Sequence, residues 1–180
     1  MDYSLRFRFI QNNILEKNLL ETFEYLIYLL SISNDLDNNK GLRSQNNKLM
    51  IVLTSSIIEA VLRYIISKNL PKELNKEAYK YTEVKEIFIK NSNERYVSAK
   101  ETKLVEERKL DFNELISIAN RFKIFDKDLL KNIDIIRKDR NKIHLKLDVE
   151  EQEIKKVTVE KHFSTAGEFL LQVEKILTIN

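Results

Sequence analysis

Two glycines and one proline among 180 residues are the feature that most restricts how this chain folds. Sandwiches and barrels need a turn about every ten residues, and glycine and proline supply many of those turns. Long helices need few such residues. The composition therefore predicts an all-α fold, in which long helices are joined by a small number of polar loops. A chain of this length forms one ordinary domain, residues 1–180, and is large enough to bury a core.

The absence of cysteine excludes disulfides, zinc ribbons and thiol nucleophiles. The only histidines are His144 and His162, so a zinc site is not expected, and neither is any other metal or cofactor. The sequence has no glycine-rich phosphate loop and no glycine-flanked nucleophile turn. These absences set aside nucleotide-fold enzymes and Ser-His-Asp hydrolases.

The net charge of +3 and the isoelectric point of about 8.9 give the chain a mild basic bias. Such a bias permits an RNA or phosphate partner, but a mixed-charge surface with a small surplus explains it equally well. Residues 1–10 lack the continuous apolar core of a signal peptide, and no apolar run reaches membrane-spanning length. We therefore expect a cytoplasmic protein with no membrane partner.

Apolar residues spaced three and four apart predict helices in the first third of the chain. A first helix is expected over Gln11–Ser33, followed by a polar loop over Asn34–Ser44 and a second helix over Gln45–Asn69 that ends before Pro71. The centre of the second helix is apolar on nearly every side, which is typical of a helix in the middle of a bundle. Its one acid, Glu59, either reaches water or an arginine at an edge, or supports a basic site.

Three further helices are expected after residue 110. Asp111 and Glu114 form a capping-box pattern that opens a short helix ending at about Arg121. Asp126 or Asp128 caps the next helix, which continues to about His144. An acidic linker over residues 148–153 leads to a last helix with a clean apolar stripe, and His162 on that stripe is expected to be a packed structural residue. The sum is an antiparallel bundle of four main helices and one short one.

The segment Tyr79–Lys109 is a charged insertion between the second and third helices. Its short alternation of apolar and polar residues fits a small hairpin that turns at residues 91–93, or equally a helix followed by a loop. Its lysines and aromatic residues suit RNA, although a solvated surface insertion is the simpler interpretation.

The helix that ends near His144 carries the candidate chemistry. On a helical wheel its inward face is defined by Leu129, Ile133, Ile136 and Ile143. Four polar residues fall at the edge of that face: Arg137, Arg140, Asn141 and His144. Charges on an apolar edge need partners or an opening to solvent, so these residues are expected to be held in place. Lys138, Asp139 and Lys142 are expected to point to the opposite, solvated side.

Arginine offers a planar fork of donors that suits phosphate, and histidine exchanges protons near neutral pH. Together these residue types suffice to cleave RNA without a metal. A base removes the proton of the 2'-hydroxyl, the oxygen attacks the neighbouring phosphorus, and arginines stabilise the charged transition state. Without further context, a basic helix with one histidine is more often an ion-paired surface.

This helix resembles the signature of the HEPN superfamily, which is an arginine, a spacer of four to six residues, and a histidine. Arg137 with six residues before His144 fits the spacing. Arg140-Asn141 reproduces a common Arg-Asn pair, but its three-residue spacer is one short, so either arginine is a candidate. Asp111–Phe125 also resembles the short helix that precedes the motif, and Ser55–Ile66 resembles the family's buried second helix.

The resemblance implies a homodimer in which two motif copies face each other. It also implies a metal-independent endoribonuclease with an RNA substrate, acting as a toxin or a phage-defence effector, with Arg137, Arg140, Asn141 and His144 as its site. Many similar proteins are partnered with an antitoxin. Some toxins carry a tyrosine two residues after the histidine that an antitoxin modifies, but Lys146 stands there in this chain. The alternative implied by the resemblance is a non-catalytic module that binds a partner protein or a nucleotide.

Overall fold

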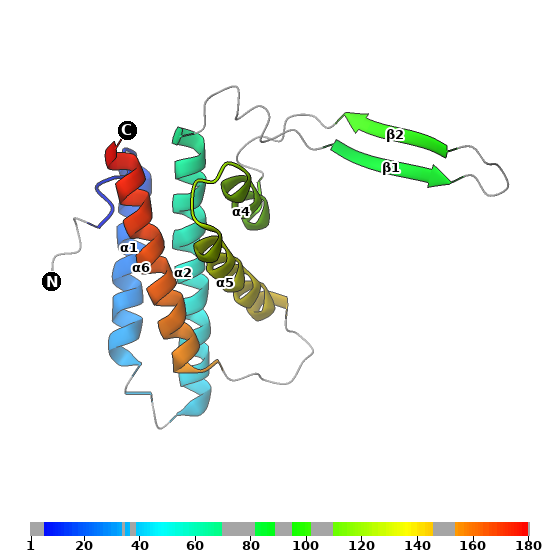
Figure 1. The fold of residues 1–180 in the computed structure, drawn as a ribbon. Helices are drawn as coiled ribbons and strands as arrows, with labels where there is room; N and C mark the ends of the chain where they lie inside the picture. The colour runs from blue at the N-terminus through cyan, green and yellow to red at the C-terminus, as the bar shows by residue number, and fades with distance from the viewer. Residues whose placement is uncertain are drawn as a thin grey trace.

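The computed structural model describes residues 6–33, 35–36, 39–69, 82–88, 95–101, 110–145 and 154–179. For residues 69, 82–88, 95–101, 144–145 and 179, only the backbone is described. These ranges contain five helices and one hairpin (Figure 1): α1 (Asn13–Ile32), α2 (Lys40–Asn69), β1 (Thr82–Phe88), β2 (Arg95–Glu101), α4 (Phe112–Arg121), α5 (Lys127–Leu145) and α6 (Lys156–Ile179). The prediction of a helical bundle is confirmed.

Helix α2 is the centre of the bundle. It packs against α1, α4, α5 and α6, while the short helix α4 also packs against α5 (Figure 1). Because α2 is surrounded, it needs apolar residues around most of its circumference rather than along a single stripe. This is the placement that its sequence predicts.

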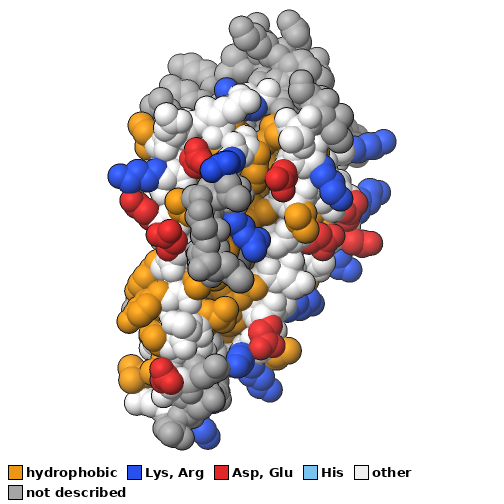
Figure 2. Space-filling view, turned by 90° about the vertical axis from the view of Figure 1, so that its left-hand side faces the viewer, with side chains coloured by type: hydrophobic (Ala, Val, Ile, Leu, Met, Phe, Trp, Pro, Cys, Tyr) orange, Lys and Arg blue, Asp and Glu red, His pale blue; other side chains and the backbone are white. Residues whose placement is uncertain are grey.

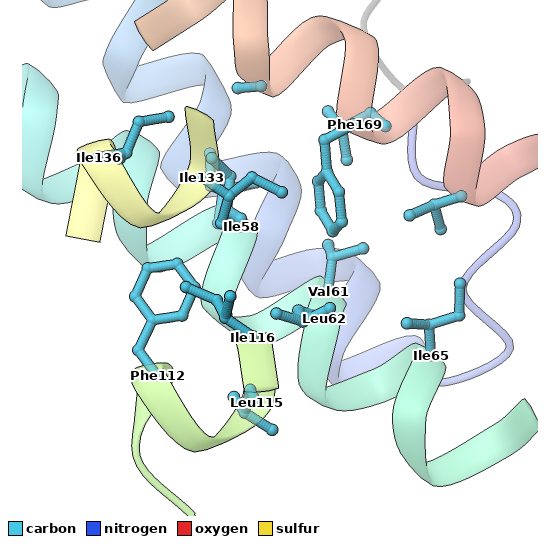
Figure 3. Packing of buried hydrophobic residues seen from close by; sticks show 14 of the residues in the cluster. Ile58, Val61, Leu62, Ile65, Phe112, Leu115, Ile116, Ile133, Ile136 and Phe169 are labelled. Carbon is cyan, nitrogen blue, oxygen red and sulfur yellow. The ribbon is translucent and has the colours of Figure 1, made fainter. Parts of the chain in front are cut away.

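The core is built on α2 and receives side chains from its neighbours (Figure 3). Ile58, Val61, Leu62 and Ile65 of α2 are completely buried. They meet apolar residues of α4, α5 and α6, among them Phe112, Leu115, Ile116, Ile133, Ile136 and Phe169. Each fully buried side chain of this size contributes about 1.5–3 kcal/mol relative to exposure. The helices that flank α2 are therefore placed by a shared core.

Helix α2 begins earlier than the sequence predicts. The expected loop over residues 34–44 includes Gly41, yet the helix starts at Lys40. The reason is a cap at Asn39, whose side-chain oxygen accepts a hydrogen bond from the Leu42 amide at 3.1 Å. A glycine in the first turn is tolerated because this cap satisfies an amide that would otherwise lack a partner.

By length and composition, Lys40–Lys68 is also apolar enough to cross a membrane, although 61% of its most apolar window is buried inside the bundle. This corrects the expectation that no segment reaches that length. Thr54, Ser55 and Glu59 interrupt the apolar run, but the most apolar window of the helix stays apolar enough on average. The core helix of a bundle passes the same test, and α2 packs as one.

The charged insertion contains the hairpin that was one of its two sequence interpretations. β1 and β2 pair antiparallel, with Thr82 opposite Glu101 and Phe88 opposite Arg95. The residues expected to form the turn, 91–93, lie outside the described part of the chain. The helix-and-loop alternative is wrong for the two paired segments.

The face of the molecule beside α1 carries both signs of charge, with apolar side chains gathered in its lower part (Figure 2). Tyr25 and Tyr28 of α1 are exposed, and their rings stack with centroids 6.2 Å apart. Lysines, arginines and acids are interleaved over the rest of this face. It therefore shows the mixed-charge surface expected for a small net charge, rather than a basic patch.

The two ends of α4 follow local sequence rules. Asp111 accepts from the Glu114 amide at 2.8 Å and the Glu114 carboxylate accepts from the Asp111 amide at 2.7 Å, which confirms the capping box. At the other end, the Ile124 amide donates to Ala119 and the Lys123 amide donates to Asn120, which is the Schellman pattern. Asp126, rather than Asp128, caps α5 by accepting from the Leu129 amide at 2.8 Å.

The Schellman turn gives a stability prediction, because Lys123 adopts a left-handed φ of 52° that favours glycine. We expect Lys123→Gly to raise the free energy of unfolding by about 0.5–1 kcal/mol, since relief of the side-chain clash exceeds the added freedom of the unfolded chain. Urea unfolding measures this difference. Lys123→Ala retains a Cβ atom and should leave stability nearly unchanged. A glycine variant less stable than the alanine variant would contradict this account of the turn.

Candidate functional site

The candidate site lies along one edge of α5. Its inward face is formed by side chains that are at most 1% exposed, those of Leu129, Ile133 and Ile136. Their burial fixes the rotation of α5 about its axis, as the helical wheel predicts. Arg137 and Arg140 then fall at the margin of the core, where their side chains are 17% and 28% exposed. The structure thus confirms that both arginines are half-buried rather than extended into solvent.

Arg140 crosses from α5 to α2. Its Nη1 atom donates to Oε2 of Glu59 at 2.8 Å, and the Glu59 carboxylate is itself only 21% exposed. The sequence interpretation in which Glu59 reaches an arginine is confirmed. This ion pair joins residues 81 positions apart, so it ties the motif helix to the central helix.

The second oxygen of Glu59 is used by another arginine. Arg63 Nη2 lies 3.3 Å from Glu59 Oε1 and also donates to the carbonyl oxygen of Leu110 at 2.7 Å. A half-buried carboxylate therefore has two guanidinium partners, and Arg63 extends the network to the start of α4. Sequence reasoning did not find Arg63, although its place four residues after Glu59 on one helix was an available signal.

Arg137 does not share this network. Its Nε and Nη2 atoms both lie 2.8 Å from Oδ1 of Asp134, one turn earlier on α5. The other oxygen of Asp134 accepts from Lys138 at 2.7 Å. Partial burial raises the pKa of Asp134, but the hydrogen bonds from Lys138 and Arg137 together hold it below its usual 3.8. Asp134 therefore stays ionised near neutral pH and orients the Arg137 guanidinium.

The other two predicted site residues are placed less fully. Asn141 is exposed at the outer edge of α5. His144 lies in the last turn of α5, and its side chain is outside the described part of the structure. Along the helix axis, the backbone of His144 is about 10 Å from that of Arg137 and about 6 Å from that of Arg140. The backbone therefore places all four residues on neighbouring turns, while the described contacts bind the two arginines to different carboxylates.

Asp139 corrects the expectation that it points to the solvated side of α5. Its carboxylate is 21% exposed, and Oδ2 lies 3.1 Å from Nε2 of His162 on α6. The His162 ring is almost fully buried, as expected of a structural histidine. Since a carboxylate only accepts, the neutral ring donates through Nε2–H. The wheel could not show that α6 packs against this flank of α5, whereas Lys138 and Lys142 are exposed as predicted.

The charges around the motif leave a positive surplus. Arg63, Arg137, Lys138 and Arg140 are set against the carboxylates of Glu59 and Asp134. The cluster of Arg137, Lys138 and Asp134 retains one more cation than anion, and a half-buried guanidinium group binds phosphate well because it has further donors. The arrangement suits an anion better than a metal, since the carboxylates are already used by arginine and lysine.

Comparison with protein-family models, with curated proteins and with solved structures finds no match to this chain.

The Glu59–Arg140 pair yields a prediction about stability. We expect Glu59→Ala to lower the free energy of unfolding by about 2–3 kcal/mol, because it leaves two half-buried guanidinium groups without their carboxylate. A double-mutant cycle with Arg140→Ala should give a coupling of about 1–2 kcal/mol. The matched control is the cycle of Asp134→Ala with Arg137→Ala, a pair within one helix, for which we expect about 0.5 kcal/mol. Equal couplings in the two cycles would show that the pair to α2 has no special role.

His162 yields a prediction about pH. Burial of the ring lowers its pKa below the usual 6.5, and the Asp139 carboxylate reverses only part of that shift. The unfolded chain therefore takes up a proton at a higher pH than the folded chain does. Stability is full above about pH 6.5 and falls as the pH drops towards the lower, folded pKa, by at most about 1.4 kcal/mol per pH unit from this group.

Thermal unfolding between pH 7.5 and 5 measures this loss. We expect His162→Gln to remove the share of the acid-induced loss of stability that this ring causes, because glutamine can still donate to Asp139 but does not titrate in that range. His144→Gln changes the only other histidine in the chain and should keep the native profile. If His144→Gln flattens the profile and His162→Gln does not, the assignment is wrong.

Proposed function

We propose that the protein is a metal-independent endoribonuclease of the HEPN type, acting in the cytoplasm as a toxin or a phage-defence effector. The observation that carries the proposal is on α5, where Arg137 precedes His144 by two helical turns and its guanidinium is held by the ionised Asp134. Residues seven apart on a helix lie within about 20° of the same direction. The helical bundle, with its buried second helix and its capped short helix before α5, fits the same family arrangement.

Arg137 is the arginine that we assign to the phosphate. Its anchor, Asp134, also binds Lys138, so this cluster keeps a net positive charge two helical turns before His144. Arg140 has its Nη1 atom on Glu59 of the central helix α2. We therefore assign Arg140 as a positioning residue that holds the motif helix against α2, which fits its shorter spacing to the histidine.

The chemistry then needs no metal. His144 accepts the proton of the 2'-hydroxyl as the 2'-oxygen attacks the adjacent phosphorus, and Arg137 stabilises the negative charge that develops on the phosphoryl oxygens. The bond from phosphorus to the 5'-oxygen breaks, and that oxygen receives a proton from the protonated His144 of the same site or of the second copy. Asn141, exposed one turn before His144, donates to the RNA backbone.

The proposal includes a homodimer, because one histidine in each of two facing motifs supplies both a base and an acid. An antitoxin or another defence protein is the second partner that this function requires. Lys146 in place of a modifiable tyrosine implies that such a partner acts by binding rather than by attaching nucleotides.

One observation favours the alternative of a non-catalytic HEPN module that binds a protein or a nucleotide. Both arginines of the motif are already paired with carboxylates. In a purely structural role these ion pairs would stabilise the fold without binding a phosphate, and α5 would serve as a binding surface. The two functions differ in whether RNA is cut, which is directly measurable.

We expect the purified full chain to cleave RNA in the presence of EDTA. His144→Ala should lower the rate by about 10²–10⁴-fold, as for loss of a general acid–base group. Arg137→Ala should lower it by about 10²–10³-fold, as for loss of a donor to the transition state. Gel analysis of single-turnover reactions measures these rates, and circular dichroism checks that each variant is folded.

Three variants complete the design. Lys131→Ala removes an exposed cation from α5 away from the motif and should leave the rate unchanged. Arg140→Lys keeps a cation for Glu59 and should retain most of the activity, whereas Arg137→Lys loses the planar fork and should not. Failure of the folded native chain to cut any RNA would favour the binding module. Greater sensitivity to Arg140→Lys than to Arg137→Lys would reverse the roles of the two arginines.

A further inference from the structure

The hairpin formed by β1 and β2 stands apart from the helical bundle (Figure 1). A two-stranded hairpin is at best marginally stable in water, and three or more strands are normally needed to hold such a sheet together. Each strand is seven residues long, and within the part of the chain that the structure describes the sheet has only these two strands, so each strand has one edge without a pairing strand. An unpaired edge of this length is a template for a further strand.

We propose that β2 pairs antiparallel with β2 of a second copy of this chain, so that two hairpins form one four-stranded sheet. In the register centred on Ser98, all seven residues of the strand have a partner. Ser98 stands opposite Ser98, Val97 opposite Ala99, Tyr96 opposite Lys100 and Arg95 opposite Glu101. The inference goes beyond the proposed function and does not depend on ribonuclease activity.

The self-complementarity of β2 in this register carries the proposal. The two-fold axis repeats every pair, so the register contains two matches of opposite charge, one at each end of the strand. Within the hairpin, Arg95 stands opposite Phe88 and Glu101 opposite Thr82, so β1 offers neither of them an opposite charge directly across. Opposite charges across an antiparallel pair contribute about 0.2–1 kcal/mol each.

The other edge of the hairpin does not show this match. The full-length antiparallel register of β1 with its own copy is centred on Lys85, which places two lysines opposite each other. It also places Val84 opposite Glu86. Like charges directly opposite are destabilising. The sequence therefore selects the β2 edge for self-pairing.

The charge of the hairpin also selects a protein partner over a nucleic acid. β1 and β2 together contain three basic residues, Lys85, Arg95 and Lys100, and three acidic residues, Glu83, Glu86 and Glu101. Nucleic-acid surfaces need a surplus of positive charge to release counterions from the phosphates. A neutral hairpin with alternating signs instead suits a second copy of itself.

Cross-linking of the full chain tests the register, because the native sequence has no cysteine. The proposal places the two Ser98 residues directly opposite, at about 4.5–5.5 Å between Cα atoms, which is within the range of a disulfide. We expect Ser98→Cys to form a covalent dimer under mild oxidation. Ala99→Cys is the control, because the two copies of residue 99 are offset by two positions along the strand. Equal cross-linking of both variants, or of neither, would overturn the register.

Charge reversal tests the affinity by sedimentation at micromolar concentration. We expect Arg95→Glu to weaken the dimer at least about tenfold, because it sets like charges opposite each other twice. Glu101→Arg should do the same, and the double variant should restore the native affinity since the opposite charges are exchanged. Lys85→Glu makes the matched change on β1 and should leave the dimer unchanged.

Three results would overturn the proposal. One is a native chain that is monomeric at micromolar concentration. Another is a dimer that neither single reversal affects. The third is a loss of RNA binding, rather than of dimerisation, on Arg95→Glu, because the edge would then serve nucleic acid. Cleavage of RNA by native chain is measured separately, so failure of the strand pairing and failure of the ribonuclease proposal remain distinguishable.

Discussion

A partly buried carboxylate on the central helix of a bundle needs cationic partners, and the ion pairs of Glu59 on α2 help to set the position of α5. Glu59 is half-buried on α2 and binds Arg63 on its own helix and Arg140 on α5. Removing either partner would leave a charge at the margin of the core, which costs more than the pair itself contributes. The network therefore acts mainly as a constraint. Together with the buried Leu129, Ile133 and Ile136, it holds α5 in place beside α2. Arg63 extends the constraint to Leu110, just before α4.

The remaining contacts of α5 are divided by face. Apolar residues bind it to α2 and α4, Asp139 binds it to the buried His162 of α6, and Asp134 orients Arg137 along its outer edge. A helix held on three sides presents the residues of its fourth side in a fixed arrangement. Catalytic groups need such preorganisation, because interactions realised only in the transition state are the ones that accelerate a reaction. The paired arginines are thus compatible with catalysis, because a guanidinium group has five N–H donors and the carboxylates use only some of them.

Much of this architecture follows from sequence because local rules and burial point the same way. The scarcity of glycine and proline predicts helices, and the all-round apolar centre of α2 predicts its place in the bundle. The capping box at Asp111 marks the start of α4. What the sequence could not supply depends on contacts between distant residues. The sequence places Asp139 on the surface because it does not show that α6 packs beside it. The spacing of Arg63 from Glu59 indicates their ion pair, but the second partner of Arg63, the Leu110 carbonyl 47 positions away, could not be predicted. The start of α2 was placed late because Gly41 resembles a loop residue, whereas the cap that decides it is Asn39.

The chemistry of the RNA ends tests the central claim most directly, because it reports the nucleophile rather than the mere presence of a nuclease. Mass spectrometry of a short RNA cut by the purified chain in EDTA identifies both new termini. Attack by the 2'-hydroxyl predicts a 2',3'-cyclic phosphate on one fragment and a 5'-hydroxyl on the other. A 3'-hydroxyl with a 5'-phosphate would mean that water attacks the phosphorus, and the assignment of His144 and Arg137 would then be contradicted.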